Sequence, residues 1–356
     1  MKLYNDVVNG IKPAYEEAKK EASMRLDNLA KPIGSLGKLE DIAIKLAGIT
    51  GKVMNKTEKK CTVIMAADNG IVEEGVSTCP QYVTTAQTIN FTKGLTGVCV
   101  LSRHAGSDIR VVDIGINNDL DYPGIINRKI RKGTYNMAKG PAMSMDEATR
   151  AIEAGIETVG ELVKEGYSLL GTGEMGIGNT STSSAVAAAL LGCSIDETVG
   201  KGSGLTDEGL AEKRAVLEKT LKLNNPDGSK PLDVLSKVGG FDIAGLTGCF
   251  LAAAYYRVPI VIDGFISAAA ALAAYRINPL TRDFMIPSHC SEEPGYKLVM
   301  ENMGLEPMLN LGMRLGEGSG CPLAFNIIEA AEKIVSDMAT FEEAAIVNDF
   351  LIDIRK

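Results

Sequence analysis

The sequence has no tryptophan and only two histidines, His104 and His289. Zinc sites in proteins are commonly built from His and Cys. Two histidines, together with seven scattered cysteines that form no C-x-x-C pair, leave little material for such a site. We therefore expect no metal and no cofactor. An odd number of cysteines also argues against a disulfide framework and favours a reducing, cytoplasmic compartment.

Long apolar runs and basic clusters are absent as well. The N-terminal stretch MKLYNDVVNGIKPAYEEAKKEA is charged and amphipathic, and no later segment is apolar for long enough to span a bilayer, so we expect neither export nor membrane insertion. The 37 Lys and Arg residues are outnumbered by 45 Asp and Glu, for a formal net charge of -8. Nucleic acids require a positive footprint. The expected partner is therefore a small molecule.

The chain does contain an alternation of short β-branched runs and helical segments. Five runs are typical of strands: TVIMAA (62–67), RVVDIG (110–115), YSLLGTG (167–173), PIVIDG (259–264) and DFMIPS (283–288). Helical patterns such as those at 146–166 and 180–192 separate them. This alternation predicts an α/β fold in which helices flank a parallel sheet.

Four of the five runs meet a carboxylate, namely Asp68, Asp113, Glu174 or Asp263, and the fifth precedes His289. Ligands of parallel sheets bind outside the carboxyl ends of the strands. The pattern therefore predicts one crevice lined by acidic side chains and glycine loops.

Both ends of the chain have helical spacing. Residues 5–50 carry apolar positions three or four apart, interrupted by KPIGSLGK at 31–38, and the stretch after residue 326 returns to the same spacing. We predict a small helical subdomain built from residues 1–58 and 331–356. The large α/β catalytic domain would then span residues 59–330.

The stretch GTGEMGIGNTSTSSAV (171–186) has the strongest signal. Its first glycines satisfy G-x-G-x-x-G between a strand and a helix, which indicates a dinucleotide site and hence an NAD-dependent oxidoreductase. However, the second strand with the usual acidic residue is missing, because Asp196 lies in a segment without β-branched continuity. Six polar residues from Asn179 to Ser184 at a helix start favour an anion such as phosphate, although one or two would suffice for simple capping.

Three further segments contain chemically useful residues. In VGKGSGLTDEGLAEKRAV (199–216) a helix begins near Thr206 and presents Lys213, which can reach a nearby phosphate, although surface lysines are usually solvated. The loop PSHCSEEPGYK (287–297) suits ligand binding better than a serine-hydrolase triad. From Asp68 a long glycine-rich loop continues to Gln87, and loops of that length are often functional.

Taken together and in order, these segments resemble one family. RLDNLAKPIGSLGKLE, AADNGIVEEGVS, GTGEMGIGNTS, GLTDEGLAEKRAV, DGFISAAAAL, SHCSEEPG and RLGEGSG look like the motifs of nicotinate-nucleotide:5,6-dimethylbenzimidazole phosphoribosyltransferases, which prepare the lower ligand of cobamides. The resemblance spans the whole chain. It implies a Rossmann-like sheet with a small helical domain, and a homodimer.

The resemblance also implies roles for individual residues. Glu317 of RLGEG would be the general base. The donor nucleotide and its phosphate would be held by Glu174, Gly176, Gly178, Asn179, Thr180, Lys213, Asp263 and Ser291. The incoming aromatic base would lie against Cys79, Gln87 and Leu315.

The chain departs from the family pattern at Asn69, Cys79 and Tyr296, which leaves the acceptor open. It could be 5,6-dimethylbenzimidazole, a related base, or a phenol such as p-cresol. Some relatives that use phenols act as heterodimers of two homologous chains, so a heterodimer stays an alternative to the homodimer. A non-catalytic partner subunit is the alternative from another functional class.

Overall fold

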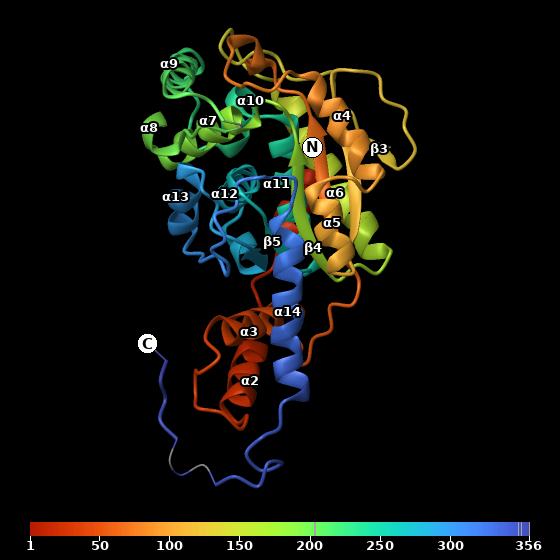
Figure 1. Ribbon diagram of the computed structural model, residues 1–356, viewed down its shortest axis with the longest axis vertical. Coiled ribbons are helices and arrows are strands. Elements are labelled where there is room, and N and C mark those ends of the chain that lie inside the picture. The colour runs from red at the N-terminus through yellow and green to blue at the C-terminus, as the bar shows by residue number, and fades with distance from the viewer. Residues whose placement is uncertain (203, 348, 350, 356) are drawn as a thin grey trace.

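The computed structural model describes residues 1–202, 204–347, 349 and 351–355. Its centre is a six-stranded, all-parallel sheet in the order β3-β2-β1-β4-β5-β6 (Figure 1). The strands are β1 (Lys60–Ala67), β2 (Asp108–Gly115), β3 (Ile125–Asn127), β4 (Leu169–Met175), β5 (Ile260–Ile262) and β6 (Met285–Pro287). The predicted α/β fold with a parallel sheet is thus confirmed.

All five predicted strands are present, and β3 is the one that the sequence analysis missed. β3 has three residues and pairs only with β2 at the edge of the sheet. A three-residue segment is too short to display the alternation on which strand prediction depends. Its omission leaves the central strands, and therefore the crevice, unaffected.

Helices cover both faces of the sheet. One face packs on α6 (Met145–Lys164), α11 (Phe241–Tyr256) and α12 (Phe265–Ile277), and the other on α4 (Tyr82–Thr92), α5 (Gly97–His104) and α14 (Gly320–Asp337). Strand β1 shows the alternation, since Val63 and Met65 belong to the core with α11 while Ile64 packs with Phe91 and Val98. All eight β1 residues are buried, as expected for a central parallel strand.

The remaining elements pack around this core. They are α7 (Asn179–Leu191), α8 (Ile195–Thr198), α9 (Asp207–Asn224), α10 (Pro231–Val238), α13 (Pro294–Met303) and the 3-10 helices η1 (Gly70–Glu74) and η2 (Pro279–Phe284). Helix α9 is capped by the Thr206 hydroxyl, which accepts the Gly209 N–H at 3.1 Å. The predicted helix start near Thr206 is therefore confirmed.

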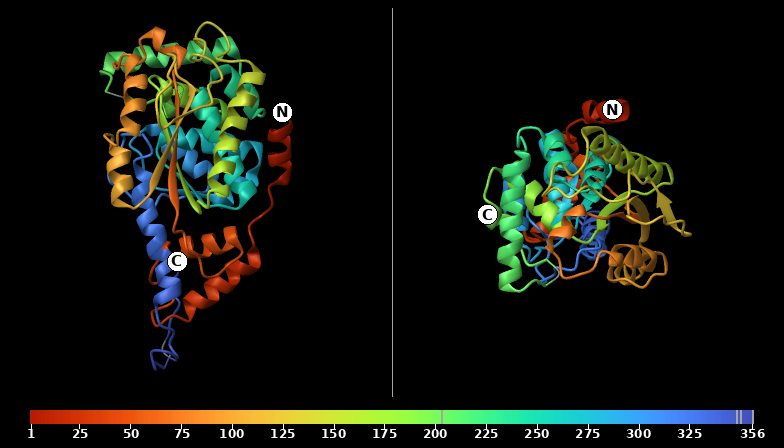
Figure 2. Two further views of the ribbon diagram at one scale, coloured as in Figure 1. Left: turned by 90° about the vertical axis from the view of Figure 1, so that its right-hand side faces the viewer. Right: turned by 90° about the horizontal axis from the view of Figure 1, so that it is seen from above.

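Segments from near both ends of the chain meet below the sheet. Helices α2 (Glu16–Asp27) and α3 (Lys38–Thr50) pack beside the C-terminal half of α14, and this group projects from the body of the molecule (Figures 1 and 2). Helix α1 (Lys2–Gly10) instead lies against α6 and α11. The apolar cluster of α3 and α14 also includes Val261 and Ile286 of the sheet. The division into domains 1–58 with 331–356 and 59–330 stays a prediction.

Helical spacing after residue 326 predicted a helix through the C-terminal region, and that prediction is wrong beyond Asp337. Helix α14 ends there, and Met338 adopts an extended conformation. The Ala30 N–H donates to the Ala339 carbonyl and the Phe341 N–H to the Asn28 carbonyl. Hydrogen bonds to residues 28–30 hold the backbone out of a helix at residues 339–341. The spacing of apolar residues does not reveal such a partner segment. Residues 348, 350 and 356 lie outside the described residues.

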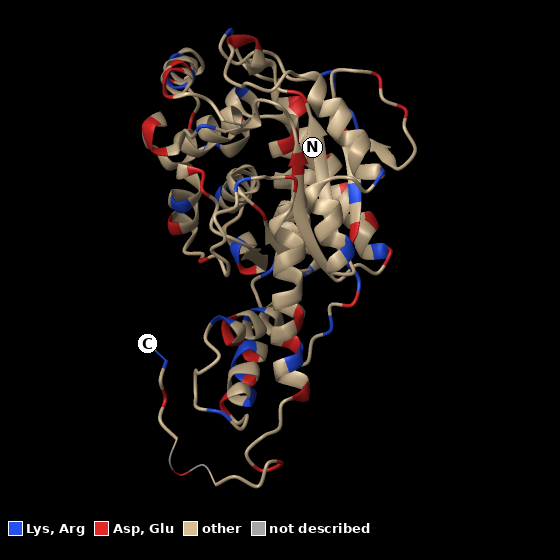
Figure 3. Cartoon of the chain, viewed as in Figure 1, with Lys and Arg blue, Asp and Glu red and all other residues tan. Residues whose placement is uncertain are grey.

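Charged side chains lie mainly on the outer helices and loops, with both signs interspersed (Figure 3). In the part of the chain that the structure describes, no helix combines the length and apolar character needed to cross a membrane.

Helices α6 and α11 approach each other closely through glycines. A Cβ atom on Gly155 would lie 1.9 Å from the Gly245 carbonyl oxygen, and one on Gly248 would lie 2.0 Å from the Ile152 carbonyl oxygen. Backbone atoms cannot move aside as a flexible side chain can. The close crossing of these helices therefore requires glycine, which has no side chain, at positions 155 and 248.

We predict that Gly155→Ala lowers the free energy of unfolding by about 1–3 kcal/mol, because the added methyl group forces the two helices apart. Urea denaturation monitored by circular dichroism measures the change. Gly209→Ala is the matched control, since its nearest neighbour is the movable Leu205 side chain at 3.1 Å and alanine favours a helix by up to about 1 kcal/mol. Equal destabilisation by both substitutions would contradict this account.

Candidate active site

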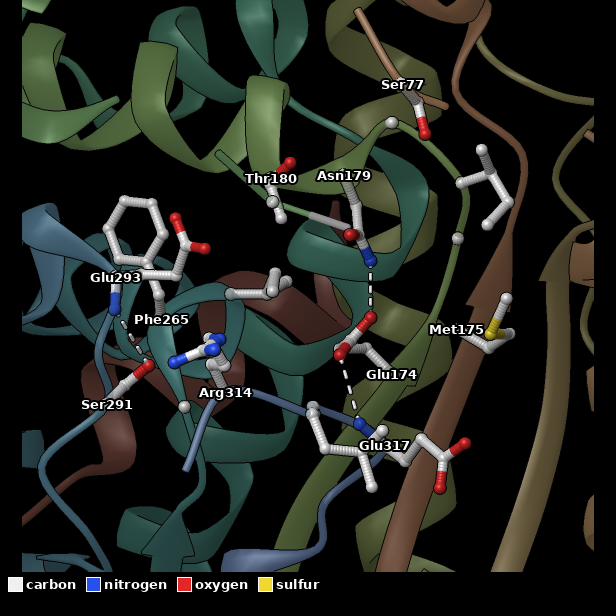
Figure 4. Close-up of a pocket in the computed structure, with 18 of the residues that line it drawn as sticks. Ser77, Glu174, Met175, Asn179, Thr180, Phe265, Ser291, Glu293, Arg314 and Glu317 are labelled. Atoms are coloured by element: carbon white, nitrogen blue, oxygen red, sulfur yellow. Dashed lines mark hydrogen bonds between the residues drawn. The ribbon is translucent and has the colours of Figure 1, made fainter. Parts of the chain in front are cut away.

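The carboxyl ends of the central strands open onto a cavity of about 350 Å³ (Figure 4). Its walls come from the segments that follow β1, β4, β5 and β6, together with residues 314–317. The predicted crevice is thus present. Most of the predicted site residues line it: Gln87, Glu174, Gly176, Gly178, Asn179, Thr180, Ser291, Leu315 and Glu317. Cys79, Lys213 and Asp263 do not line the cavity.

Glu317 lies at one wall of the cavity and is 8% exposed. Its Oε1 accepts a hydrogen bond from Gln87 Nε2 at 2.6 Å, and its Oε2 accepts one from the Val98 N–H at 3.3 Å. These two donors orient the carboxylate while leaving it further lone pairs for a proton. The acid is therefore held toward the cavity and away from bulk water.

The backbone at Glu317 is in the left-handed region, with φ of 63° between Gly316 at 82° and Gly318 at 90°. A non-glycine residue in this conformation carries a strain of roughly 1–3 kcal/mol, and such strain is often found at functional sites. The loop conformation thus favours glycine at positions 316, 317 and 318. The chain nevertheless has a glutamate at position 317, which is consistent with a functional role for that side chain.

Glycines in and just after β4 allow neighbouring segments to approach this strand closely. A Cβ atom on Gly173 would lie 2.5 Å from the Glu317 carbonyl oxygen, and one on Gly171 would lie 2.6 Å from Cys321 Cβ. On Gly176 it would meet the Ala67 carbonyl oxygen at 2.4 Å. The G-x-G-x-x-G pattern is therefore explained by tight packing inside the protein, and the geometry gives no support to a dinucleotide fingerprint or to an oxidoreductase.

The Asp263 side chain was expected to contact the donor nucleotide, but it points to the backbone of the loop at 318–320. Its Oδ1 accepts the Gly320 N–H at 2.6 Å, and its Oδ2 accepts the Gly318 N–H at 3.1 Å. Burial raises the pKa of Asp263 to about 7, although these N–H groups lower it. Its carboxylate therefore holds the loop that carries Glu317, and a direct ligand contact has no geometric support.

Glu174, at the end of β4, joins the same loop from the other side. Its Oε1 accepts the Glu317 N–H at 3.3 Å, while its Oε2 accepts a hydrogen bond from the Asn179 side chain (Figure 4). Asn179 Nδ2 also donates to Asp242 at 3.1 Å. Burial raises the pKa of Glu174 to about 8 and that of Asp242 to about 6. These acids accordingly bring less negative charge to the cavity than their number implies.

The candidate anion site lies at the start of α7. Gly178, with φ of 90°, directly precedes the helix, so the positive end of the helix dipole borders the cavity, while the Asn179 and Ser181 N–H groups donate to the Gly176 and Gly178 carbonyls at 3.0 and 2.9 Å. Thr180 lines the cavity, and its Oγ1 accepts a hydrogen bond from Lys213 Nζ at 3.0 Å. Lys213 is 1% exposed and also donates to the Gly200 carbonyl at 3.1 Å. Burial lowers the pKa of Lys213 to about 8.

The six successive polar residues are not all available to a ligand. Thr182 donates to the Asn179 carbonyl, and Ser184 donates to the carbonyls of Thr180 and Thr198. Ser181 and Ser183 are buried. Of this run, Asn179 and Thr180 line the cavity. Fewer residues of this run are therefore available to an anion than the sequence suggests.

Gln87 belongs to helix α4, so the predicted loop from Asp68 to Gln87 is shorter than expected. Cys79 does not line the cavity, whereas its neighbour Ser77 does. Asn69 and Tyr296 are fully buried and also do not line it. The departures from the family pattern therefore do not alter the cavity wall directly.

Sequence reasoning gave no individual role to the other lining residues: Ser77, Val83, Met175, Ile177, Gly202, Gly264, Phe265, Ile266, His289, Glu293, Arg314 and Gly316. Arg314 extends into the cavity near Ser291 and Glu293 (Figure 4). His289 and Glu293 belong to a loop that the sequence analysis did assign to ligand binding. Arg314 is the first residue of RLGEG, so its place in that motif was the available signal. Among the described residues, no group of three His, Cys, Asp or Glu side chains is placed to bind a metal ion.

Comparisons with known proteins agree on one family. A family model described as phosphoribosyltransferase matches residues 11–346. A nicotinate-nucleotide–dimethylbenzimidazole phosphoribosyltransferase of Ruminiclostridium cellulolyticum is 58% identical over 343 residues, which is 96% of this chain and 97% of that protein. The protein of the same name from Clostridium acetobutylicum is 57% identical over 341 residues, covering 96% and 97%.

A solved structure is also similar. The crystal structure of a nicotinate-nucleotide–dimethylbenzimidazole phosphoribosyltransferase from Thermus thermophilus superposes with a TM-score of 0.88 at 40% sequence identity, covering 93% of this chain and 98% of that one. The family match, the sequence identity and the fold lead to one conclusion. The chain belongs to the family of nicotinate-nucleotide–dimethylbenzimidazole phosphoribosyltransferases.

Proposed function

We propose that this chain transfers the phosphoribosyl group of nicotinate mononucleotide to a flat aromatic base, producing nicotinate and an α-linked ribotide for cobamide synthesis. The observation that carries the proposal is the convergence of Glu317 and the start of α7 on one cavity. One element supplies a carboxylate, and the other supplies the positive end of a helix together with the Thr180 hydroxyl and the adjacent Lys213 ammonium for a phosphate. Family membership supports the same substrates, which the names of the relatives state.

The chemistry requires little more than one carboxylate. In nicotinate mononucleotide the pyridine nitrogen carries a formal positive charge. When the bond between C1′ and this nitrogen breaks, nicotinate leaves with the bonding pair and needs no proton. The incoming ring nitrogen forms the new bond to C1′ from the opposite face, so the β linkage becomes α.

As the new bond forms, positive charge develops on the incoming ring, and its other nitrogen must release a proton. Glu317 is proposed to accept that proton as the general base. An anchor for the phosphate, distant from C1′, would hold the ribose in line for attack and reduce the entropy of activation. Thr180, the α7 start and the charge of Lys213 are the proposed anchor.

The proposed acceptor wall consists of Ser77, Val83, Gln87, Met175 and Leu315, which border the cavity around Glu317. Three apolar side chains, one hydroxyl and one amide suit a flat ring that carries a single dissociable proton. Benzimidazoles and phenols share that feature, because a phenol hydroxyl can release its proton to Glu317 and attack through oxygen. A phenol-using enzyme therefore stays the alternative acceptor class.

We further propose a homodimer, with a heterodimer of two homologous chains as the alternative. Exposed apolar side chains at the start of α4, in the segment after it and in the loop before α14 support association: Tyr82 is 69%, Leu95 is 68% and Leu315 is 60% exposed. Light scattering of the purified chain gives the oligomeric state. Activity that requires a second, homologous chain would instead favour the role of a partner subunit.

The proposed function is tested by incubating the purified chain with nicotinate mononucleotide and a panel of benzimidazoles, purines and phenols. We expect nicotinate release together with an α-ribotide of at least one base, identified by mass spectrometry and NMR. The absence of nicotinate release with every base would refute the activity. The base with the highest kcat/KM identifies the acceptor class.

We predict that Glu317→Gln lowers kcat by about 10²–10⁴-fold, because the amide cannot accept the proton. The KM for nicotinate mononucleotide should change little, since the proposed phosphate anchor lies elsewhere. Steady-state kinetics with the preferred base measures both constants. Glu292→Gln is the matched control, because Glu292 does not line the cavity. Unchanged turnover of the Glu317 variant would remove this residue from the mechanism.

We predict that the KM for nicotinate mononucleotide rises as pH increases through about 8, the lowered pKa of Lys213. The protonated lysine attracts the phosphate dianion, and the neutral amine does not. Lys213→Met should raise this KM and abolish its rise across a pH range that spans the lysine pKa of about 8. Lys219→Met, an exposed position on the same helix, should behave like the unaltered protein. A pH-dependent KM in the Lys213 variant would assign the effect to another group.

A further inference from the structure

His289 is a cavity residue to which neither the mechanism nor the anion site gives a role. It follows β6, is 1% exposed, and lines the cavity on the side of β5 and β6. The same wall also includes Gly264 and Ser291. A buried imidazole that borders a ligand cavity has two distinct nitrogens, and the partner of one determines what the other can do.

The Nδ1 side of the ring faces the protein. Ser288 Oγ lies 3.0 Å from Nδ1, and the same hydroxyl is placed to donate to the Asp263 carbonyl at 3.3 Å. With its hydrogen directed to that carbonyl, the Ser288 oxygen is an acceptor for Nδ1–H. The Asp263 carboxylate oxygen Oδ1, 3.9 Å from Nδ1, also favours a proton there. Both neighbours select the tautomer with hydrogen on Nδ1.

The Nε2 side of the ring faces the cavity wall. A Cβ atom on Gly264 would lie 4.0 Å from His289 Nε2 and 3.8 Å from Ser291 Oγ, so both polar atoms border the space beside this glycine. Within the described residues Nε2 has no hydrogen-bond partner, although Nδ1 does. The Nδ1–H tautomer leaves a lone pair on Nε2, directed to whatever occupies that space.

We propose that His289 is a specificity-determining residue that recognises the sugar of the donor, with Nε2 accepting a hydrogen bond from one of the ribose hydroxyl groups. The inference rests on the proposed function, because it assumes that a ribonucleotide occupies this cavity. It adds a contact that selects ribose against a deoxyribose at the same position.

The arrangement of the cavity favours a ribose hydroxyl over the other parts of the substrates. The proposed phosphate anchor lies at the start of α7, and the proposed acceptor wall lies around Gln87 on α4, so the β5–β6 side remains for the sugar and the leaving ring. The lone pair on His289 Nε2 repels the nicotinate carboxylate and attracts the hydrogen of a ribose hydroxyl group. Burial lowers the pKa of His289 to about 4, so the ring stays neutral near pH 7.

The test compares nicotinate mononucleotide with its 2′-deoxy and 3′-deoxy analogues in the unaltered protein and in two variants. His289→Asn keeps a side-chain N–H near the Nδ1 position but has no atom at Nε2. His289→Gln places an amide oxygen near the Nε2 position. Nicotinate release gives kcat/KM for each donor with one fixed base.

We expect the unaltered protein to prefer the ribose donor to one deoxy analogue by about 10- to 100-fold, the usual range for one lost hydrogen bond that leaves a buried partner unpaired. His289→Asn should lose most of this preference by slowing the ribose donor alone, and His289→Gln should restore part of it. An equal loss with all donors would show a structural role and overturn the inference, as would the absence of any preference in the unaltered protein. Failure of that protein to release nicotinate would refute the proposed function instead.

A second measurement needs no variant of His289. Because the chain has two histidines, His104 and His289, ¹⁵N NMR of the imidazole nitrogens gives few signals, and His104→Gln assigns them. We expect His289 to show a protonated Nδ1 and an unprotonated Nε2 whose signal shifts when nicotinate mononucleotide is added. A protonated Nε2, or a signal that the nucleotide leaves unchanged while it alters other resonances, would overturn the inference.

Discussion

The carboxylate of Asp263 determines the geometry on which the rest of the site depends. Its two oxygens accept the N–H groups of Gly318 and Gly320, so the end of β5 is bonded directly to the loop before α14. On the other side the Glu174 carboxylate accepts the Glu317 N–H. The loop is therefore fixed between two neighbouring strands, and the Glu317 side chain extends from a rigid support. Preorganisation of this kind suits the role of general base that we propose for Glu317.

The site places several acids near an expected anionic substrate, which at first conflicts with simple electrostatics. Burial reduces the conflict, since it raises the pKa of Glu174 to about 8 and that of Asp263 to about 7, so that near pH 7 Glu174 is largely protonated and Asp263 partly so. Carboxyl groups that retain protons in this way serve as hydrogen-bonding supports with reduced charge. Two cations are also close by, since Arg314 extends into the cavity and Lys213 lies behind Thr180, to which it donates.

Much of this arrangement could be predicted from the sequence, because strand ends are marked by β-branched runs followed by acids. That pattern located Glu174 and Asp263 correctly at one edge of the sheet. It could not show that Asp263 turns toward backbone N–H groups, because side-chain direction depends on tertiary packing. Nor could it show that Gly171 and Gly173 make room for α14 and the loop before it, since close packing and phosphate binding select glycine alike. His289 was assigned to a ligand loop, but its tautomer depends on Ser288 and is visible only in three dimensions.

The left-handed turn at 316–318 restricts where evolution or an engineer could put the acid. Moving it one residue earlier would bring a side chain to within 2.5 Å of the Glu174 carboxylate, and moving it one residue later would press Cβ to within 2.9 Å of Gly173 Cα. The middle position avoids both collisions. Redesign of acceptor preference should therefore leave this turn and its partner Gln87 unchanged and vary other lining residues such as Val83.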